Sequence, residues 1–349
     1  MHTPLAEITA ASLVLNQQEP ADLLAPGGHG TARGSGVDFD IRRDLGRKGT
    51  RTLDRAAGLA MHAVGRLPGM DAGPGDETPD LPDVGIVLAT TMGSIQSTMD
   101  FTRDSFTGVR PFHVDPARFP NTVMNFAAGQ CAIRYRIQGP NATVTTGHVG
   151  SFTALAYAVR LLHSGHARRM IVGASEELST ARARLEQVWG GSTTLGEGAA
   201  AVLVEPRGAG EEPVGEILGL DSALAIDPES TESVLHQLFE RVLGGSEPTA
   251  ANRPHVRVVA PGDAGPDSAE TRAAARLLGA EEFRTVSVVD AAAHTGDVGS
   301  ASGLVQLQAA LAALRAAGAD APQDCALISG TDREGAVHVA LVRLPQDAP

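Results

Sequence analysis

The stretch GPNATVTTGHVGSFTAL (residues 139–155) decides the fold of this chain. Residues 143–146 form a short run of types that favour strands, and Gly147 permits a sharp bend that a side chain would obstruct. The apolar residues from Phe152 onward recur at the spacing of a buried helix. A side chain at such a bend faces a helix N-terminus, where free N–H groups favour negative charge, so the position suits a nucleophile. This chain places His148 there.

The stretch resembles the region around the nucleophile of the ketosynthases, which condense acyl chains in fatty-acid and polyketide synthesis. Further segments resemble other ketosynthase motifs in the same order, at residues 121–140, 169–177, 196–205 and 290–311. Several motifs in order are more specific than any single one. The resemblance implies an α/β thiolase fold, in which two related halves form a five-layer α-β-α-β-α sandwich. We place these halves at residues 1–206 and 207–349, divided at the turn-rich stretch that begins with Pro206.

Ketosynthases use a cysteine, two histidines and a lysine, and the resemblance allows each position to be checked. His148 stands in the place of the cysteine, and an imidazole cannot hold an acyl chain as a stable thioester. Pro261 replaces the first histidine and has neither a side-chain donor nor an N–H. Asp297 replaces the second, and an ionised carboxylate only accepts hydrogen bonds. Ala292 takes the place of the lysine. Four substitutions together argue for loss of the condensation reaction.

This profile resembles the chain-length factor of type II polyketide synthases, a ketosynthase-like subunit that lacks the active cysteine. That subunit pairs with a cysteine-bearing ketosynthase and shapes the tunnel in which the chain grows. The resemblance implies a heterodimer in polyketide antibiotic biosynthesis that works with a phosphopantetheine-carrying acyl carrier protein, and no cofactor bound to this chain. Chain-length factors usually carry glutamine in place of the cysteine, so His148 departs from their pattern.

The resemblance also places a substrate tunnel. Residues 112–126 would cross toward the tunnel of the partner, and residues 143–146 would pair with their twin across the dimer axis, since an exposed strand edge invites pairing. The small Val123 predicts a longer or straighter tunnel than in relatives with bulky aromatics near this position. Simple core packing is an equally good interpretation at each single position. The candidate tunnel residues are Pro116, Phe119, Thr122, Val123 and Thr193, the last of which stands where ketosynthases have a gating aromatic.

A second function stays open at this point. His148 with Asp297 or His294 could act as an acid–base pair in acyl transfer, cyclisation or dehydration, because a His–Asp pair can orient a proton shuttle. The chain would then be an atypical acyl-processing enzyme. A homodimeric scaffold without activity differs from the chain-length-factor hypothesis only in its partner.

The composition of the chain limits its expected location and the ligands that it can bind. The chain has 349 residues, of which 42% are hydrophobic, so it can bury a large core. No apolar run reaches membrane length and no secretory leader pattern is found, so we expect a cytoplasmic protein without membrane contact. The net charge of −13 argues against binding to nucleic acid. Cys131 and Cys325 are too few for a disulfide framework and show no metal-type spacing, so we expect buried thiols and no metal. A basic cluster at residues 42–51 is interpreted as a solvated surface.

The remaining pattern is typical of an α/β protein. Apolar runs predict strands at residues 8–15, 84–89, 285–290, 325–329 and 337–344. Helical spacing of small and aliphatic residues predicts helices at residues 52–64 and 301–317.

Overall fold

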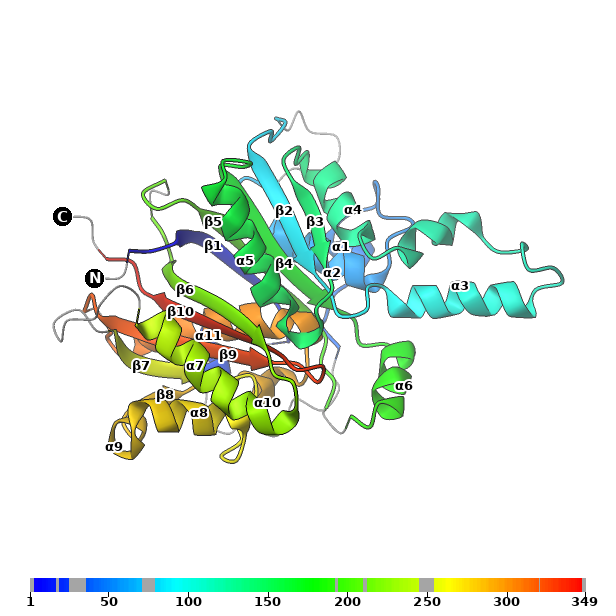
Figure 1. Ribbon diagram of the computed structural model, residues 1–349. Coiled ribbons are helices and arrows are strands. Elements are labelled where there is room, and N and C mark those ends of the chain that lie inside the picture. Colours follow the sequence, from blue (N-terminus) through cyan, green and yellow to red (C-terminus); the bar gives the residue numbers. More distant parts are fainter. Residues whose placement is uncertain are drawn as a thin grey trace.

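The computed structural model describes residues 3–16, 19–24, 36–70, 79–191, 194–209, 212–244, 254–319 and 321–346. Its strands form a mixed sheet whose two halves pack on central helices and are covered by further helices outside (Figure 1). The first set of elements is β1 (Ala6–Val14), η1 (Pro20–Leu24), α1 (Ile41–Asp44), α2 (Arg55–Gly65), β2 (Val84–Ala89), α3 (Ile95–Thr107), η3 (Pro116–Thr122), α4 (Phe126–Tyr135), β3 (Asn141–Val144), η4 (Gly147–Val149), α5 (Gly150–His163), β4 (Arg169–Glu176), α6 (Thr180–Val188) and β5 (Gly198–Glu205). The second set is β6 (Gly215–Leu224), η5 (Pro228–Ser230), α7 (Thr231–Leu243), β7 (His255–Ala260), α8 (Ala269–Leu278), α9 (Ala280–Phe283), β8 (Ser287–Val288), α10 (Ala292–Thr295), η6 (Gly299–Ala301), α11 (Ser302–Ala316), β9 (Asp324–Thr331) and β10 (Ala336–Arg343).

The strand order reveals a repeated design. The ten strands lie in the order β3-β2-β4-β5-β1-β6-β10-β9-β7-β8. The first set of five strands, β1–β5, and the second set, β6–β10, therefore have the same arrangement, but in opposite directions along the sheet. β2 is parallel to β3 and β4, and β7 is parallel to β8 and β9 in the same way. A short antiparallel ladder between β1 and β6 joins the two sets at their edges. The structure therefore has two related halves; the boundary between residues 206 and 207 stays a prediction.

Alternation along the strands sorts side chains into separate layers, because successive residues of a strand face opposite sides of the sheet. In β2, Ile86 packs toward α2 and α4, whereas Val87 packs toward α5. The central apolar cluster takes residues from both five-stranded sets and from α5 and α11 between them. A third cluster lies between the second set and α7 and α8. The predicted order helix–sheet–helix–sheet–helix is confirmed.

The two central helices can lie inside because they carry small and aliphatic residues. Almost every residue of α11 from Gly303 to Leu314 is buried. A Cβ built on Gly303 would lie 2.7 Å from the ring of Phe152 and from Oγ of Ser151 on α5. Glycine at this position therefore lets the two helices approach closely beneath the candidate site.

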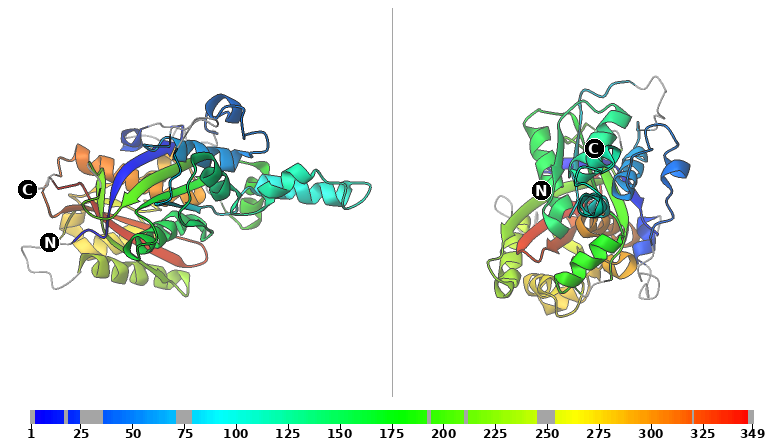
Figure 2. Two further views of the ribbon diagram at one scale, coloured as in Figure 1. Left: turned by 90° about the horizontal axis from the view of Figure 1, so that it is seen from above. Right: turned by 90° about the vertical axis from the view of Figure 1, so that its right-hand side faces the viewer.

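An arm formed by α3 and η3 projects from the body (Figures 1 and 2). Several of its apolar side chains face solvent: Phe106 is 83% exposed, Val109 92% and Phe112 69%. Within the arm, the rings of Phe101 and Phe119 lie 5.9 Å apart between centroids. Exposed apolar side chains gathered on one projection are typical of a surface that a partner covers.

Most predicted elements are confirmed with small shifts of their ends. The strand expected at residues 143–146 is β3, which ends at Val144 because the chain turns through η4 from Gly147. The strand expected at residues 285–290 is reduced to the two residues of β8, since few of its side chains are buried. Cys131 and Cys325 are buried free thiols, as predicted, and burial raises the pKa of both. In the described ranges, none of the helices is both long and apolar enough to cross a bilayer.

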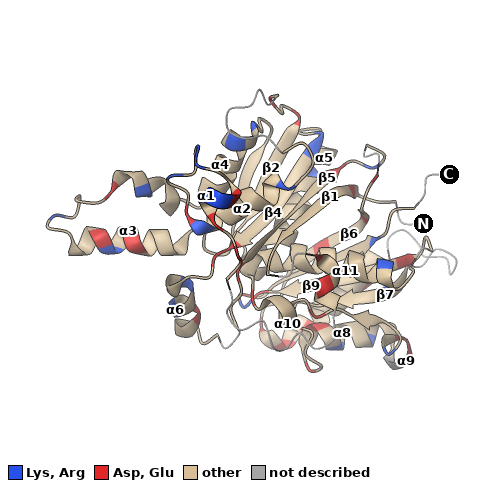
Figure 3. Cartoon of the chain, turned by 180° about the vertical axis from the view of Figure 1, so that it is seen from behind, with Lys and Arg blue, Asp and Glu red and all other residues tan. Residues whose placement is uncertain are grey.

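The basic cluster at residues 42–51 lies around α1, where Figure 3 shows blue segments beside red ones. Arg43 forms ion pairs with Asp38 and Asp44 at 3.0 and 2.8 Å. These exposed pairs agree with the interpretation of a solvated surface.

Candidate functional site

His148 lies in η4, between the end of β3 and the start of α5. Gly147 makes the bend possible: its φ is +59°, a conformation that favours glycine, and a Cβ there would collide with the carboxylate of Asp332. The predicted bend before a buried helix is therefore confirmed, and it brings the nucleophile position to the junction of the two halves.

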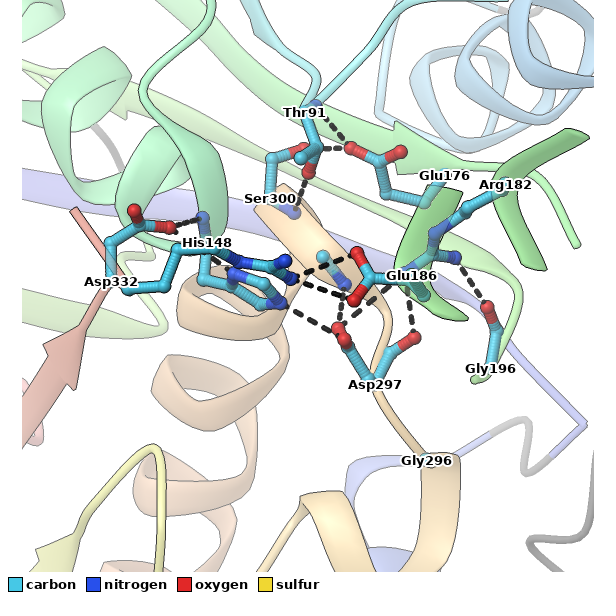
Figure 4. A network of polar contacts seen from close by, with 12 residues as sticks. Thr91, His148, Glu176, Arg182, Glu186, Gly196, Gly296, Asp297, Ser300 and Asp332 are labelled. Carbon is cyan, nitrogen blue, oxygen red and sulfur yellow. Dashed lines mark hydrogen bonds and ion pairs between the residues drawn. The ribbon is translucent and has the colours of Figure 1, made fainter. Parts of the chain in front are cut away.

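Two carboxylates hold the imidazole of His148 (Figure 4). Nε2 lies 2.9 Å from Oδ2 of Asp297, and Nδ1 lies 3.2 Å from Oδ2 of Asp332. The backbone N–H of His148 also donates to Asp332 Oδ2 at 2.9 Å. Both ring nitrogens are thus engaged, and a ring with two carboxylate acceptors is satisfied only when both nitrogens carry a proton.

Asp297 is itself held by a buried arginine. The side chain of Arg182, 2% exposed, donates to the Asp297 carbonyl oxygen at 2.9 Å and lies 3.4 Å from Oδ1. Arg182 also donates to the carbonyl oxygen of Gly196 at 2.8 Å, and the N–H of Gly299 donates to Asp297 Oδ1 at 2.7 Å. The site is therefore a row of alternating charges, Asp332–His148–Asp297–Arg182, which we call the charge row.

The charge row fixes the protonation of its members. Burial by itself would lower the pKa of His148, but the hydrogen bonds and charges of Asp297 and Asp332 outweigh it and raise the pKa to about 10. Burial opposes ionisation of the two carboxyls as well, yet the bonds to His148 lower the pKa of each to about 2. At neutral pH these pKa shifts and the two hydrogen bonds favour an imidazolium between two carboxylates, a form that has no free ring lone pair.

The other predicted catalytic positions gather around the same space. Asp297 and Ala292 line a cavity of about 790 Å³ together with His148. Pro261, at the end of β7, is buried, and its neighbour Gly262 lines the cavity. The structure thus brings three of the four substituted positions to one cavity and places the fourth next to its wall, and neither Pro261 nor Ala292 has a side-chain donor. His294, on α10, is next to the cavity-lining Ala293.

The tunnel candidates lie elsewhere. Pro116, Phe119 and Thr122 belong to η3 on the projecting arm (Figure 1), and Val123 follows it and lines a small pocket with Leu88, Phe126 and Thr143 of the body. Phe119 is 57% exposed and Val123 43%, so packing within this chain leaves both side chains partly open to solvent. Thr193 lies outside the described residues. The assignment of these residues to a tunnel stays a prediction.

Sequence reasoning missed several members of the site. Asp332 belongs to the turn between β9 and β10, and the two predicted strands around residues 330–335 mark a hairpin turn there. Arg182 and Glu186 lie on α6, and the sequence carries no signal that they turn inward. Glu186 pairs with Arg333 at 2.7 Å, which ties α6 to the same hairpin turn.

A second polar network connects the halves beside the charge row (Figure 4). Oγ of Ser300 donates to Glu176 Oε1 at 2.8 Å, and the N–H of Thr91 donates to the same oxygen. Gly299 has a φ of +54° and packs against Thr91 and Glu176. A Cβ at this position would lie 2.7 Å from Cγ of Glu176. These bonds hold the loop that carries Asp297 in a fixed position.

Comparison with known proteins agrees with this geometry. Residues 37–209 match the family model described as β-ketoacyl synthase, N-terminal domain. A 3-oxoacyl-[acyl-carrier-protein] synthase 2 from Coxiella burnetii is 27% identical over 143 residues, which is 41% of this chain and only 34% of that enzyme. The enzyme of the same name from Vibrio harveyi is 22% identical over 77% of this chain and 71% of its own length.

Solved structures extend the likeness to the whole chain. The ishigamide ketosynthase/chain length factor has a TM-score of 0.82 and 34% identity over 97% of this chain and 99% of its own. A type II ketosynthase in the AntDE:AntF complex with its acyl carrier protein has a TM-score of 0.75 at 15% identity, over 98% of this chain and 100% of its own, which shows the fold alone. The predicted thiolase fold is thereby confirmed, and the chain belongs to the β-ketoacyl synthase family.

Proposed function

We propose that this chain is a non-catalytic ketosynthase-like subunit, a chain-length factor that pairs with a cysteine-bearing ketosynthase and shapes the acyl tunnel of a type II polyketide synthase. The observation that carries the proposal is the charge row: His148, at the nucleophile position, is held between Asp297 and Asp332.

Condensation needs a group that carries the acyl chain and groups that polarise the extender thioester. A protonated imidazole has no lone pair to attack a thioester, and Pro261 and Ala292 offer no functional side chain. Asp297 carries a negative charge, which would repel the enolate oxygen that a histidine would stabilise. All four positions therefore favour a role without condensation.

Pairing with another chain is supported by the arm and by the sheet edge. Exposed apolar side chains on the arm would be stabilised by burial against a partner. β3 lies at the outer end of the sheet, where an unpaired strand edge can accept a second chain. The ishigamide protein is a ketosynthase/chain length factor, and the AntDE:AntF structure contains an acyl carrier protein. By analogy we propose a ketosynthase partner and a phosphopantetheine-carrying acyl carrier protein, with no cofactor bound to this chain.

A second candidate function is acid–base chemistry by His148 in an atypical acyl-processing enzyme. The cavity that reaches the imidazole favours this idea, because a substrate could enter it. A pKa of about 10 weighs against it, since efficient proton transfer needs a pKa near the working pH.

The deciding experiment is affinity purification of the tagged chain from its native host, with partner identity and stoichiometry read by mass spectrometry. We expect a cysteine-bearing ketosynthase at an equal amount. The variant Phe112→Asp, on the arm, should lose the partner, whereas Ile226→Asp, 93% exposed on the body, should keep it. A homodimer without a ketosynthase, or turnover of an acyl substrate by the isolated chain that His148→Ala abolishes, would contradict the proposal.

A further inference from the structure

The charge row forms only part of the wall of the 790 Å³ cavity. Another part of the wall is built by Gln306 on α11 and Glu270 on α8. A Cβ built on Gly262 would lie 3.1 Å from Oε1 of Glu270 and 3.4 Å from Nε2 of Gln306. The two side chains therefore reach the same small volume from different elements.

Gln306 contributes a polar side chain to the cavity wall. It is 4% exposed, lies on a helix that is otherwise buried among aliphatic residues, and lines the cavity. Within the described ranges, no hydrogen bond of its side chain is found. Because the side chain lines the cavity, its amide is available to a polar group that enters there.

Glu270 is a buried carboxyl that forms no ion pair with any of the described residues. It is 2% exposed, and its Oε2 accepts from the N–H of Gly262 at 2.6 Å and from Ser329 at 2.7 Å. Among the described residues, Oε1 accepts only from Thr331, at 2.9 Å, which leaves one of its lone pairs without a donor. Burial raises the pKa of Glu270, and the nearby charge of Asp263 raises it further. A cation beside Oε1 would lower this pKa and so oppose both effects.

The residues that line the cavity carry more negative than positive charge. Among the described lining residues, five are carboxylic acids, whereas only His148 and Arg333 are cationic. His148 is neutralised within the charge row and Arg333 by Glu186. Asp263 and Glu270 are thus left without a cation in the described part of the chain, and the cavity attracts positive charge.

The geometry points to a binding site for a small organic cation, and we propose a primary ammonium on a short apolar chain as its ligand. The ammonium would donate to Glu270 and to the side-chain oxygen of Gln306. The chain would lie against the apolar wall, to which Phe152 and Trp189 contribute. An alkylammonium thus supplies the donors that both polar groups lack, and this site does not depend on which partner the subunit binds.

The test is isothermal titration of the purified full chain with four six-carbon probes at neutral pH: hexylammonium, hexanoate, hexanol and hexanamide. We expect hexylammonium to bind at least tenfold more tightly than the other three. Glu270→Gln and Gln306→Met should each weaken it at least tenfold, whereas Glu229→Gln, an exposed carboxyl on η5, should leave binding unchanged.

The comparison among probes uses the unaltered protein, so it decides the question even where a buried variant fails to fold. Binding of hexanamide or hexanol as tight as that of hexylammonium would show that the cavity selects shape rather than charge and would overturn the proposal. Failure of hexylammonium to bind would overturn it as well.

Discussion

Replacing His148 with Gln should flatten the pH dependence of stability above neutral pH. The folded chain keeps the proton of His148 up to a pKa of about 10, whereas the unfolded chain loses it near the ordinary value of 6.5. A raised pKa contributes stability that is fully present below about pH 6.5 and is lost as pH rises through 10. The opposite holds for Asp297 and Asp332, whose lowered pKa values lose their contribution only as pH falls from 3.8 toward about 2.

The magnitude follows from the difference of one bound proton between the folded and unfolded chains. That difference lowers the free energy of unfolding by about 1.4 kcal/mol per pH unit, or about 2 kcal/mol between pH 7.0 and 8.5. The side chain of His148 is 25% exposed, so most of this effect should survive solvent screening. Higher pH is avoided because unfolded thiols of Cys131 and Cys325 begin to ionise there, while burial raises the pKa of both thiols in the folded chain.

The assay is urea denaturation at half-unit steps between pH 6.5 and 8.5 for the wild type, His148→Gln and the control His113→Gln, an exposed histidine of the arm. We expect wild type and control to lose about 2 kcal/mol more than His148→Gln between pH 7.0 and 8.5. The imidazole Cε1–H resonance of His148 should also stay at its protonated position up to pH 9. Parallel stability curves, or a resonance that titrates near 6.5, would refute the assignment of a charge row.

In the complex with a ketosynthase, Val123→Phe should shorten the acyl product, and Val123→Ala should leave it unchanged or longer; mass spectrometry of the products measures this, and an unchanged length with Phe would remove Val123 from the tunnel. His148→Cys should not restore condensation, because the supporting groups are also replaced, so radiolabelled malonyl transfer into a longer chain by the isolated variant would contradict the substitution argument. Gly147→Ala combines a strained φ of +59° with a collision against Asp332 and should cost more than about 2 kcal/mol of stability, whereas Gly165→Ala, at φ +72° in open space, should cost only about 1 kcal/mol. Equal losses in thermal unfolding of the two alanine variants would show that the Asp332 carboxylate moves aside freely.

The sequence by itself was sufficient for the fold, because several of its segments resemble ketosynthase motifs in the same order; local patterns predicted the single elements. Residues 139–155 carry a strand, a bend and a buried helix within one short segment, and such signals depend only on neighbours along the chain. The helix predicted at residues 301–317 and the strand at 337–344 agree with α11 and β10 for the same reason. Element ends moved by a few residues where tertiary contacts, as at β8, were too few to extend a strand.

The sequence also showed the substitutions at the four catalytic positions, but it could not show the partners and the protonation state of His148. His148 meets Asp332 across 184 residues and Asp297 across 149, and Arg182 reaches Asp297 across 115. No local pattern encodes such distances, so Asp332 and Arg182 were not foreseen. The sign of the His148 pKa shift depends on the balance between burial, which lowers it, and two carboxylates, which raise it. That balance exists only once both halves have folded against each other, because the imidazole and its two partners lie on three segments far apart in the sequence.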